Sequence, residues 1–189
     1  MNKCLFLDRD GTINKFNSGY NYKIEHVQLI PGVEKLLRKF CERGYKLAVI
    51  TNQGGIGLGL YSESDVNAVN RYIDELLAPH GAKIDGYYFC PHNEKYGHGE
   101  YKVHCSCRKP GNLLLERAIN DFDADRQVSL FIGDNYTDKL CAEKSQIAFY
   151  PFDFRNVKTT SQGFRVEITE YTDELIENIL AFSDSLNKN

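Results

Sequence analysis

Cys4-Leu5-Phe6-Leu7-Asp8-Arg9-Asp10-Gly11-Thr12 is the stretch that decides the fold class of this 189-residue chain. Its four leading apolar residues are typical of a short strand that is buried on both faces. Two carboxylates follow at once, and Gly11 allows the backbone to turn sharply. If the backbone stays extended, Asp8 and Asp10 point the same way and the arginine between them points away. The stretch therefore predicts a buried strand that ends in a pair of acids.

Predicted strands and helices alternate along the rest of the chain. Further strands are predicted at 46–50, 87–90, 128–132 and 147–150, and helices at 31–44, 62–79, 114–122, 137–144 and, at the C-terminus, about 171–187. This alternation predicts an α/β fold, a three-layer Rossmann-like parallel sheet with helices on both faces. The length is that of one domain, so we expect residues 1–189 to form a single unit.

The composition argues against two classes of partner. The chain is 42% hydrophobic and 26% charged, and its formal net charge of -3 favours neither nucleic acid nor an anionic membrane. The apolar run at the N-terminus is too short for a signal peptide, and no stretch is long enough to span a bilayer. We therefore expect a cytoplasmic protein whose six cysteines are free thiols or metal ligands rather than disulfides.

Polar clusters follow three of the predicted strands. Asp8 and Asp10 follow the first strand, Thr51-Asn52-Gln53 follows the second, and Gly133-Asp134 follows the strand at 128–132. In parallel α/β sheets, ligands bind outside the carboxyl ends of the strands. We therefore expect these clusters, which are far apart in the sequence, to meet in one crevice.

The residue types in this crevice suit phosphoryl transfer. Neighbouring carboxylates repel one another unless a cation separates them, and Mg²⁺ prefers oxygen ligands such as Asp8, Asp10 and Asp134. One carboxylate can attack phosphorus, while a second protonates the leaving group and then activates water. Thr51 and Lys109 can stabilise the charge on the transferred group. A solvated helix cap would explain any one acid, but it does not explain the whole ordered set.

A second cluster combines cysteine and histidine. Cys90-Pro91-His92 is separated by twelve residues from Cys105-Ser106-Cys107, which gives a Cys₃His set typical of tetrahedral zinc. Because protein atoms fill all four positions, we expect a structural zinc in a loop at 90–107. The alternative is a surface loop with free thiols. Arg108 and Lys109 follow directly, so a pinned loop would hold both over the phosphate crevice.

The ordered clusters resemble the four motifs of the haloacid dehalogenase (HAD) superfamily of phosphatases. The resemblance implies that Asp8 is the nucleophile, Asp10 the general acid/base, Thr51 a phosphate-binding residue and Lys109 the residue that stabilises the intermediate. It also implies a Mg²⁺ site of Asp8, the backbone carbonyl of Asp10, and Asp134. Asp138, in Gly-Asp-Asn-Tyr-Thr-Asp, resembles a supporting acid of that site.

Within the superfamily, the zinc loop and Cys-Arg-Lys-Pro at 107–110 resemble the histidinol-phosphatase-like group, which has a minimal cap. The length of the loop and the sequence at 51–56 are similar to its heptose bisphosphate phosphatases. This resemblance, over roughly residues 4–150, implies removal of the C7 phosphate of D-glycero-D-manno-heptose 1,7-bisphosphate in nucleotide-activated heptose biosynthesis. The substrate-binding positions that it implies are Asn17, Ser18, Gly19, Asn52, Gln53, Gly54, Arg108 and Asn135.

Several alternatives stay open at the level of sequence. Residues 151–170 resemble nothing in the group, and they either form an ordinary edge or line or cover the site. The substrate could be histidinol phosphate or another sugar phosphate, and a DNA 3′-phosphatase shares the first two motifs. A catalytically silent phosphosugar-binding module is the alternative of another class. We expect a small phosphorylated sugar as partner, a monomer, and no nucleic-acid or membrane partner.

Overall fold

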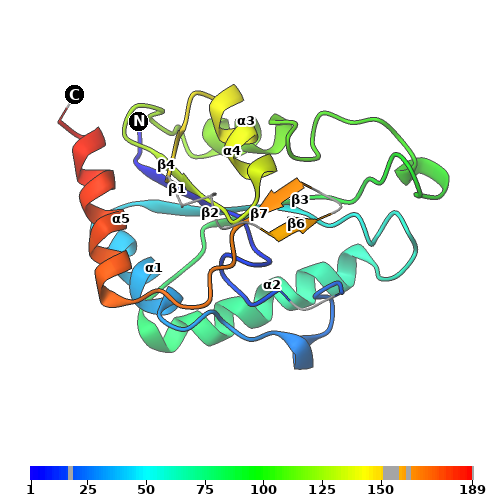
Figure 1. Cartoon of the computed structure of the whole chain (residues 1–189), viewed down its shortest axis with the longest axis horizontal. Coiled ribbons are helices and arrows are strands. Elements are labelled where there is room, and N and C mark those ends of the chain that lie inside the picture. Colours follow the sequence, from blue (N-terminus) through cyan, green and yellow to red (C-terminus); the bar gives the residue numbers. More distant parts are fainter. Residues whose placement is uncertain (17–18, 151–157, 161–162, 189) are drawn as a thin grey trace.

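The computed structural model describes residues 1–16, 19–150, 158–160 and 163–188 (Figure 1). A five-stranded sheet has the order β3-β2-β1-β4-β5, and every neighbouring pair is parallel. Its strands are β1 (Cys4–Leu7), β2 (Lys46–Asn52), β3 (Gly86–Cys90), β4 (Leu130–Ile132) and β5 (Ala148–Phe149). The helices are α1 (Val33–Glu42), α2 (Glu63–Leu77), α3 (Leu113–Asp121), α4 (Tyr136–Lys144) and α5 (Asp173–Leu186). The predicted α/β fold with a parallel sheet is confirmed.

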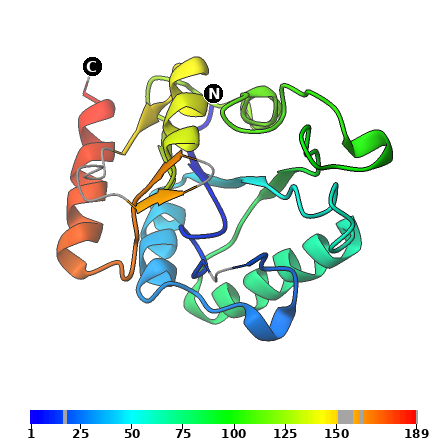
Figure 2. The ribbon, with the colours of Figure 1, turned by 45° about the vertical axis from the view of Figure 1, so that its right-hand side comes forward.

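The helices cover both faces of the sheet, as Figures 1 and 2 show. Leu5 and Leu7 of β1 are fully buried in a core that includes residues of α1, α2 and α5. Cys4 and Phe6, which alternate with them, are buried against α3 and α4. Because successive side chains of a strand point to opposite faces, four apolar residues in a row supply both cores.

Local signals explain where two of the helices begin. Helix α2 begins with a capping box, since the Ser62 Oγ accepts a hydrogen bond from the Asp65 N–H at 3.3 Å and the Asp65 Oδ2 accepts one from the Ser62 N–H at 2.8 Å. Helix α1 begins at Val33, after Gly32 in a left-handed conformation with φ of 82°. A side chain at Gly32 would overlap the Tyr171 carbonyl, so the close approach of the C-terminal segment requires a glycine there.

Among the described residues, the segments between these elements carry little further regular structure. Three 3-10 helices lie in loops, namely η1 (Ile24–His26), η2 (Ala78–His80) and η3 (Gly99–Tyr101). In the described part of residues 8–32, between β1 and α1, η1 is the one regular element, which agrees with a minimal cap. None of the described helices is both long enough and apolar enough to cross a lipid bilayer.

Two short antiparallel strands that the sequence did not indicate precede α5. They are β6 (Lys158–Thr160) and β7 (Gly163–Arg165). The end of β7 lies beside the loop after β4, because the Val166 N–H donates to the Asp134 carbonyl at 2.7 Å and Arg165 forms a backbone bridge with Asn135. Further along, the buried Tyr171 hydroxyl donates to the Thr12 carbonyl at 3.0 Å. These contacts fix the chain after β7 against the carboxyl end of the sheet.

Candidate active site and Cys-His cluster

A cavity of about 290 Å³ opens at the carboxyl ends of the central strands. It is lined by Asp8, Asp10, Phe16, Gly19, Tyr20, Asn21, Thr51, Asn52, Gln53, Lys109, Asn135, Thr137, Asp138 and Arg165. The three polar clusters at the carboxyl ends of β1, β2 and β4 therefore meet in one crevice, as the sequence predicted, although β2 extends to Asn52 and so includes part of the second cluster. Of the residues implied for this crevice, Gly54, Arg108 and Asp134 lie outside this lining, and Asn17 and Ser18 lie outside the described residues.

Lys109 lies at the base of the cavity and is only 4% exposed. Its Nζ donates to Asp8 Oδ1 at 2.8 Å and to the Ile50 carbonyl at 2.6 Å, and it forms an ion pair with Asp138 Oδ1 at 2.6 Å. Burial alone would lower the pKa of Lys109, but the two carboxylates raise it above its ordinary value. The side chain is therefore a fixed cation between two acids.

Asp138 is positioned by the start of α4. Its Oδ2 accepts a hydrogen bond from the Asn135 N–H at 3.0 Å, and Asn135 Oδ1 accepts one from the Thr137 N–H at 3.0 Å, which completes a capping box. Burial and the nearby Asp8 charge raise the pKa of Asp138 to about 6, against the opposing effect of Lys109. A side chain at Gly133 would overlap the Asp138 carboxylate, so the glycine makes room for this acid. The amide of Asn135, implied as a substrate contact, thus serves as a helix cap.

The carboxylate of Asp10 is held by four side chains. It accepts hydrogen bonds from Asn14 at 2.9 Å, Asn21 at 3.0 Å, Arg9 Nη2 at 3.0 Å and Gln53 at 2.9 Å. Burial would raise the pKa of Asp10, but the Arg9 guanidinium and the amide donors lower it below its ordinary value. The expectation that Arg9 points away from the acids is wrong, because the chain bends directly after β1 and the fully buried Arg9 turns back onto Asp10.

Asp8, Asp134 and Asp138 form an acidic cluster whose carboxylate oxygens lie within 4.8 Å of one another. Asp134 is 1% exposed, and its Oδ1 has no hydrogen-bond donor among the described residues. Burial and the charge of Asp8 raise the pKa of Asp134, and Arg165 opposes this shift. A buried carboxylate oxygen without a donor beside two further acids fits a hard cation such as Mg²⁺. The backbone carbonyl of Asp10 faces the same place, while its carboxylate does not belong to the cluster.

Arg165, at the end of β7, is a residue of this site that the sequence did not indicate. Its Nε forms an ion pair with Asp134 Oδ2, and its Nη2 donates to the Asp10 carbonyl at 2.8 Å. The guanidinium lies over the Phe16 ring, 3.7 Å from the centroid. Residues 151–170 could have formed an ordinary edge or have lined or covered the site. Arg165 lines the cavity, so this part of the segment lines the site. Arg165 lies 155 positions from Asp10 in the sequence and outside the motifs, so no sequence pattern connects the two residues.

The last residues of β2 and Gln53, which follows the strand, support the site as well as line it. The Asn52 amide accepts from the Lys109 N–H at 2.9 Å and donates to the Lys109 carbonyl at 3.1 Å. Gln53 donates to Thr51 Oγ1 at 2.9 Å and accepts from the Tyr61 hydroxyl at 2.9 Å. Both side-chain amides are thus engaged within the protein, and they connect Lys109 and Asp10 to the end of β2.

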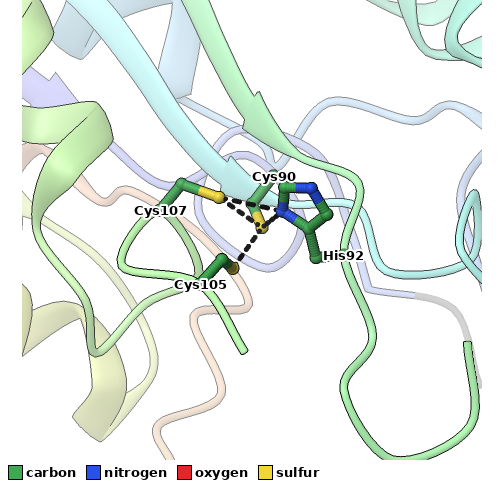
Figure 3. Close-up of side chains that lie close together, drawn as sticks. All are labelled: Cys90, His92, Cys105 and Cys107. Atoms are coloured by element: carbon green, nitrogen blue, oxygen red, sulfur yellow. Dashed lines mark hydrogen bonds between the residues drawn. The ribbon is translucent and has the colours of Figure 1, made fainter. Parts of the chain in front are cut away.

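The Cys-His cluster lies beside the site and brings together two separate pairs of residues (Figure 3). Cys107 Sγ lies 3.1 Å from both Cys90 Sγ and His92 Nδ1, Cys90 Sγ lies 3.6 Å from Cys105 Sγ, and His92 Nδ1 lies 3.5 Å from Cys90 Sγ. Tetrahedral zinc with Zn–S bonds of about 2.3 Å places sulfurs about 3.8 Å apart, so the donor set fits one zinc ion. Burial raises the pKa of the Cys90 and Cys107 thiols, a cost that a metal bound to thiolates offsets.

The loop at 90–107 is joined to the cavity by the two residues that follow it. Arg108 Nη1 donates to the His92 carbonyl at 3.3 Å and packs against Gly54, where a side chain would collide with it. Arg108 therefore connects the loop to the chain after β2. Lys109, the next residue, enters the cavity.

Comparison with known proteins agrees with this geometry. The family described as "Polynucleotide kinase 3 phosphatase" matches residues 3–165. A D-glycero-beta-D-manno-heptose-1,7-bisphosphate 7-phosphatase of Haemophilus ducreyi is 40% identical over 77% of this chain and 79% of its own length. The D-glycero-alpha-D-manno-heptose-1,7-bisphosphate 7-phosphatase of Burkholderia mallei is 42% identical over 72% of each chain.

A solved structure is similar in fold over most of this chain. The D,D-heptose 1,7-bisphosphate phosphatase of B. bronchiseptica, complexed with magnesium and phosphate, is similar with a TM-score of 0.76 and 25% identity over 95% of this chain and 99% of its own. The chain belongs to the family of HAD-like phosphatases that includes the D-glycero-D-manno-heptose-1,7-bisphosphate 7-phosphatases.

Proposed function

We propose that this chain is a magnesium-dependent phosphatase that removes the C7 phosphate of D-glycero-D-manno-heptose 1,7-bisphosphate through an aspartyl-phosphate intermediate. The observation that carries the chemistry is the buried Lys109 between Asp8 and Asp138, next to the donor-free oxygen of Asp134. The named relatives, which are about 40% identical to this chain, support the substrate.

In the first step, an oxygen of Asp8 forms a bond to phosphorus as the bond from phosphorus to the sugar oxygen breaks. Lys109 holds Asp8 in place by its hydrogen bond and lies where it can offset charge on the transferred group. Thr51, which lines the same cavity, presents a hydroxyl and an N–H to the phosphate. Magnesium, when bound at Asp8, Asp134 and the Asp10 carbonyl, supplies positive charge that offsets the charge of the phosphate.

Asp10 is proposed to move the protons of both steps. It gives a proton to the leaving sugar oxygen, and its carboxylate then takes a proton from the water that attacks phosphorus and releases Asp8. Its lowered pKa in the unliganded protein suits the second role. An anionic phosphate close by raises the pKa of a carboxyl group, which favours the protonated form that the first step needs.

The Cys-His cluster is proposed to hold a structural zinc ion. Cys90, His92, Cys105 and Cys107 provide four ligands, so no position is open for water. Its role in this proposal is to fix the loop that ends in Arg108 and Lys109. The proposed contacts for the sugar or its second phosphate are Arg108 and the turn that contains Gly19.

The test is phosphate release with Mg²⁺ from a defined panel of compounds. The panel holds both anomers of the heptose bisphosphate, histidinol phosphate and a 3′-phosphorylated oligonucleotide. Asp8→Asn is the inactive control, and Asp184→Asn, which makes the same change at an exposed position of α5, is the matched control. A clear preference for one heptose anomer supports the proposal and identifies the anomer. Equal rates on all compounds, or activity in Asp8→Asn, contradicts it.

A 3′-phosphate on an oligonucleotide is the second candidate substrate, because the matching family is described by that activity. The net charge of -3 argues against it, since binding of nucleic acid depends mainly on contacts between phosphates and basic residues. The oligonucleotide in the panel decides between the two candidates. A rate on it above the rates on both heptose anomers would favour the second.

A further inference from the structure

Arg165 contacts the two groups that the proposed magnesium site would use. Its Nε pairs with the Asp134 carboxylate, and its Nη2 donates to the Asp10 carbonyl at 2.8 Å. A metal ion at Asp134 Oδ1 would lie next to the guanidinium at Asp134 Oδ2, and both cations would use the Asp10 carbonyl, so they repel each other. The side chain of Arg165 and a divalent cation therefore compete for this position.

The charges of the site lead to the same conclusion. Three carboxylates, those of Asp8, Asp134 and Asp138, face the cations Lys109 and Arg165. The net charge of this group is then -1. Without Arg165 the net charge is -2, and one divalent cation would balance it. Lys109 is held by two acids and a backbone carbonyl, whereas among the described residues Arg165 makes its ion pair with Asp134 alone. Arg165 is thus the cation that a metal ion displaces more easily.

The backbone of Arg165 keeps the side chain close to the cavity. Val166 and Arg165 make backbone contacts with Asp134 and Asn135, and Tyr171 anchors the following segment to Thr12. A displaced guanidinium consequently stays at the cavity wall, where the Phe16 ring already packs against it. Among the described residues that line the cavity, only Arg165 and Lys109 are cationic. An anionic substrate would therefore find one arginine free to bind it.

We propose that Arg165 is an exchangeable cation of this site. It occupies the metal ligands while no metal is bound, and metal binding transfers it to a phosphate of the substrate. This inference rests on the proposed function, because it assumes the magnesium site described above. It adds a phosphate-binding and specificity residue that lies outside the motifs found in the sequence.

Metal binding without substrate tests the first half. Mn²⁺ is titrated into the metal-free protein, and the free ion is followed by electron paramagnetic resonance. Arg165→Met removes the charge and keeps much of the length, Arg165→Gln is a second variant should the first fold poorly, and Arg117→Met makes the same change at an exposed position of α3. Arg165→Met should bind Mn²⁺ at least about fivefold more tightly than the wild-type protein, whereas Arg117→Met should not differ from it.

The outcomes of this titration separate the two proposals. Mn²⁺ binding of equal or lower affinity in both Arg165 variants overturns the exchange and leaves the metal site intact. A lack of binding in every protein overturns the metal site, and the exchange with it.

Kinetics at saturating Mg²⁺ test the second half. Arg165→Met should raise the KM for the heptose bisphosphate by about tenfold, because a charge-assisted contact to phosphate is lost, and should change kcat less. Tighter metal binding together with weaker substrate binding is not expected from a general loosening of the fold. An unchanged KM would overturn the role of Arg165 in substrate binding.

Discussion

The acidic cluster and the Cys-His cluster are both suited to a metal ion, but they are built in opposite ways. Asp8, Asp134 and Asp138 come from two distant segments, are fixed by strand ends and a helix cap, and are partly neutralised by cations of the protein itself. The four ligands of the Cys-His cluster come from one short stretch of the chain, and its thiols contact one another. The sheet thus preorganises the first site, whereas in the second the proposed zinc ion would fix the loop.

The largest effect is expected from removing the cation of the acidic cluster. Lys109→Met leaves Asp8 and Asp138 buried without their shared partner, so kcat should fall by about a hundred- to a thousandfold and unfolding should cost about 3–5 kcal/mol less. Enzyme kinetics and urea denaturation measure the two effects. Lys139→Met, in an exposed pair with Glu143, is the control and should change stability by less than about 0.5 kcal/mol. A Lys109→Met enzyme with normal kcat would contradict the proposed role.

The next largest effect is expected in the Cys-His cluster. Cys107→Ala should lose the zinc, which elemental analysis should find at about one ion per chain in the wild-type protein. Because Arg108 and Lys109 follow this loop, kcat/KM should also fall by about tenfold, and limited proteolysis should cut between residues 93 and 104. Cys41→Ala, outside the cluster, should retain both zinc and activity. Wild-type protein without zinc, yet stable and active, would refute the zinc site.

A smaller effect is expected at the end of β2, where Asn52 contacts Lys109. Asn52→Leu removes both hydrogen bonds to the Lys109 backbone. If Asn52 positions Lys109, kcat should fall by about tenfold while KM stays unchanged. If its amide binds the sugar instead, KM should rise. Steady-state kinetics on the preferred substrate distinguish these outcomes.

The smallest effect is expected at Tyr61. Tyr61→Phe removes the buried hydrogen bond to Gln53 and leaves the stacked ring pair with Tyr22 in place. The free energy of unfolding should fall by about 1 kcal/mol, and kcat should change by less than about threefold. Tyr96→Phe, at a 61% exposed position, is the matched control and should leave stability unchanged. A large loss of kcat in Tyr61→Phe would show that the network around Asp10 is catalytic rather than supportive.

Much of the fold could be predicted because its signals are local. The buried strand at Cys4–Leu7, the capping box of α2 and the alternation of strands and helices each depend on neighbouring residues. The meeting of Asp8, Thr51 and Asp134 followed from the rule for parallel strands. The β6–β7 pair could not be predicted in this way, since its strands are only three residues long and carry no clear alternation.

The sequence by itself determined the fold class, the crevice at the strand ends, the Cys₃His set and the resemblance to a phosphatase family. Periodicity, spacing and residue type are enough for these conclusions. Only the tertiary structure decided that Arg9 turns onto Asp10 and that Arg165 contacts the acidic cluster. The physical reason is that these contacts depend on where the backbone bends and on which distant segment packs against it. Neither a local pattern nor the spacing of a motif records that information.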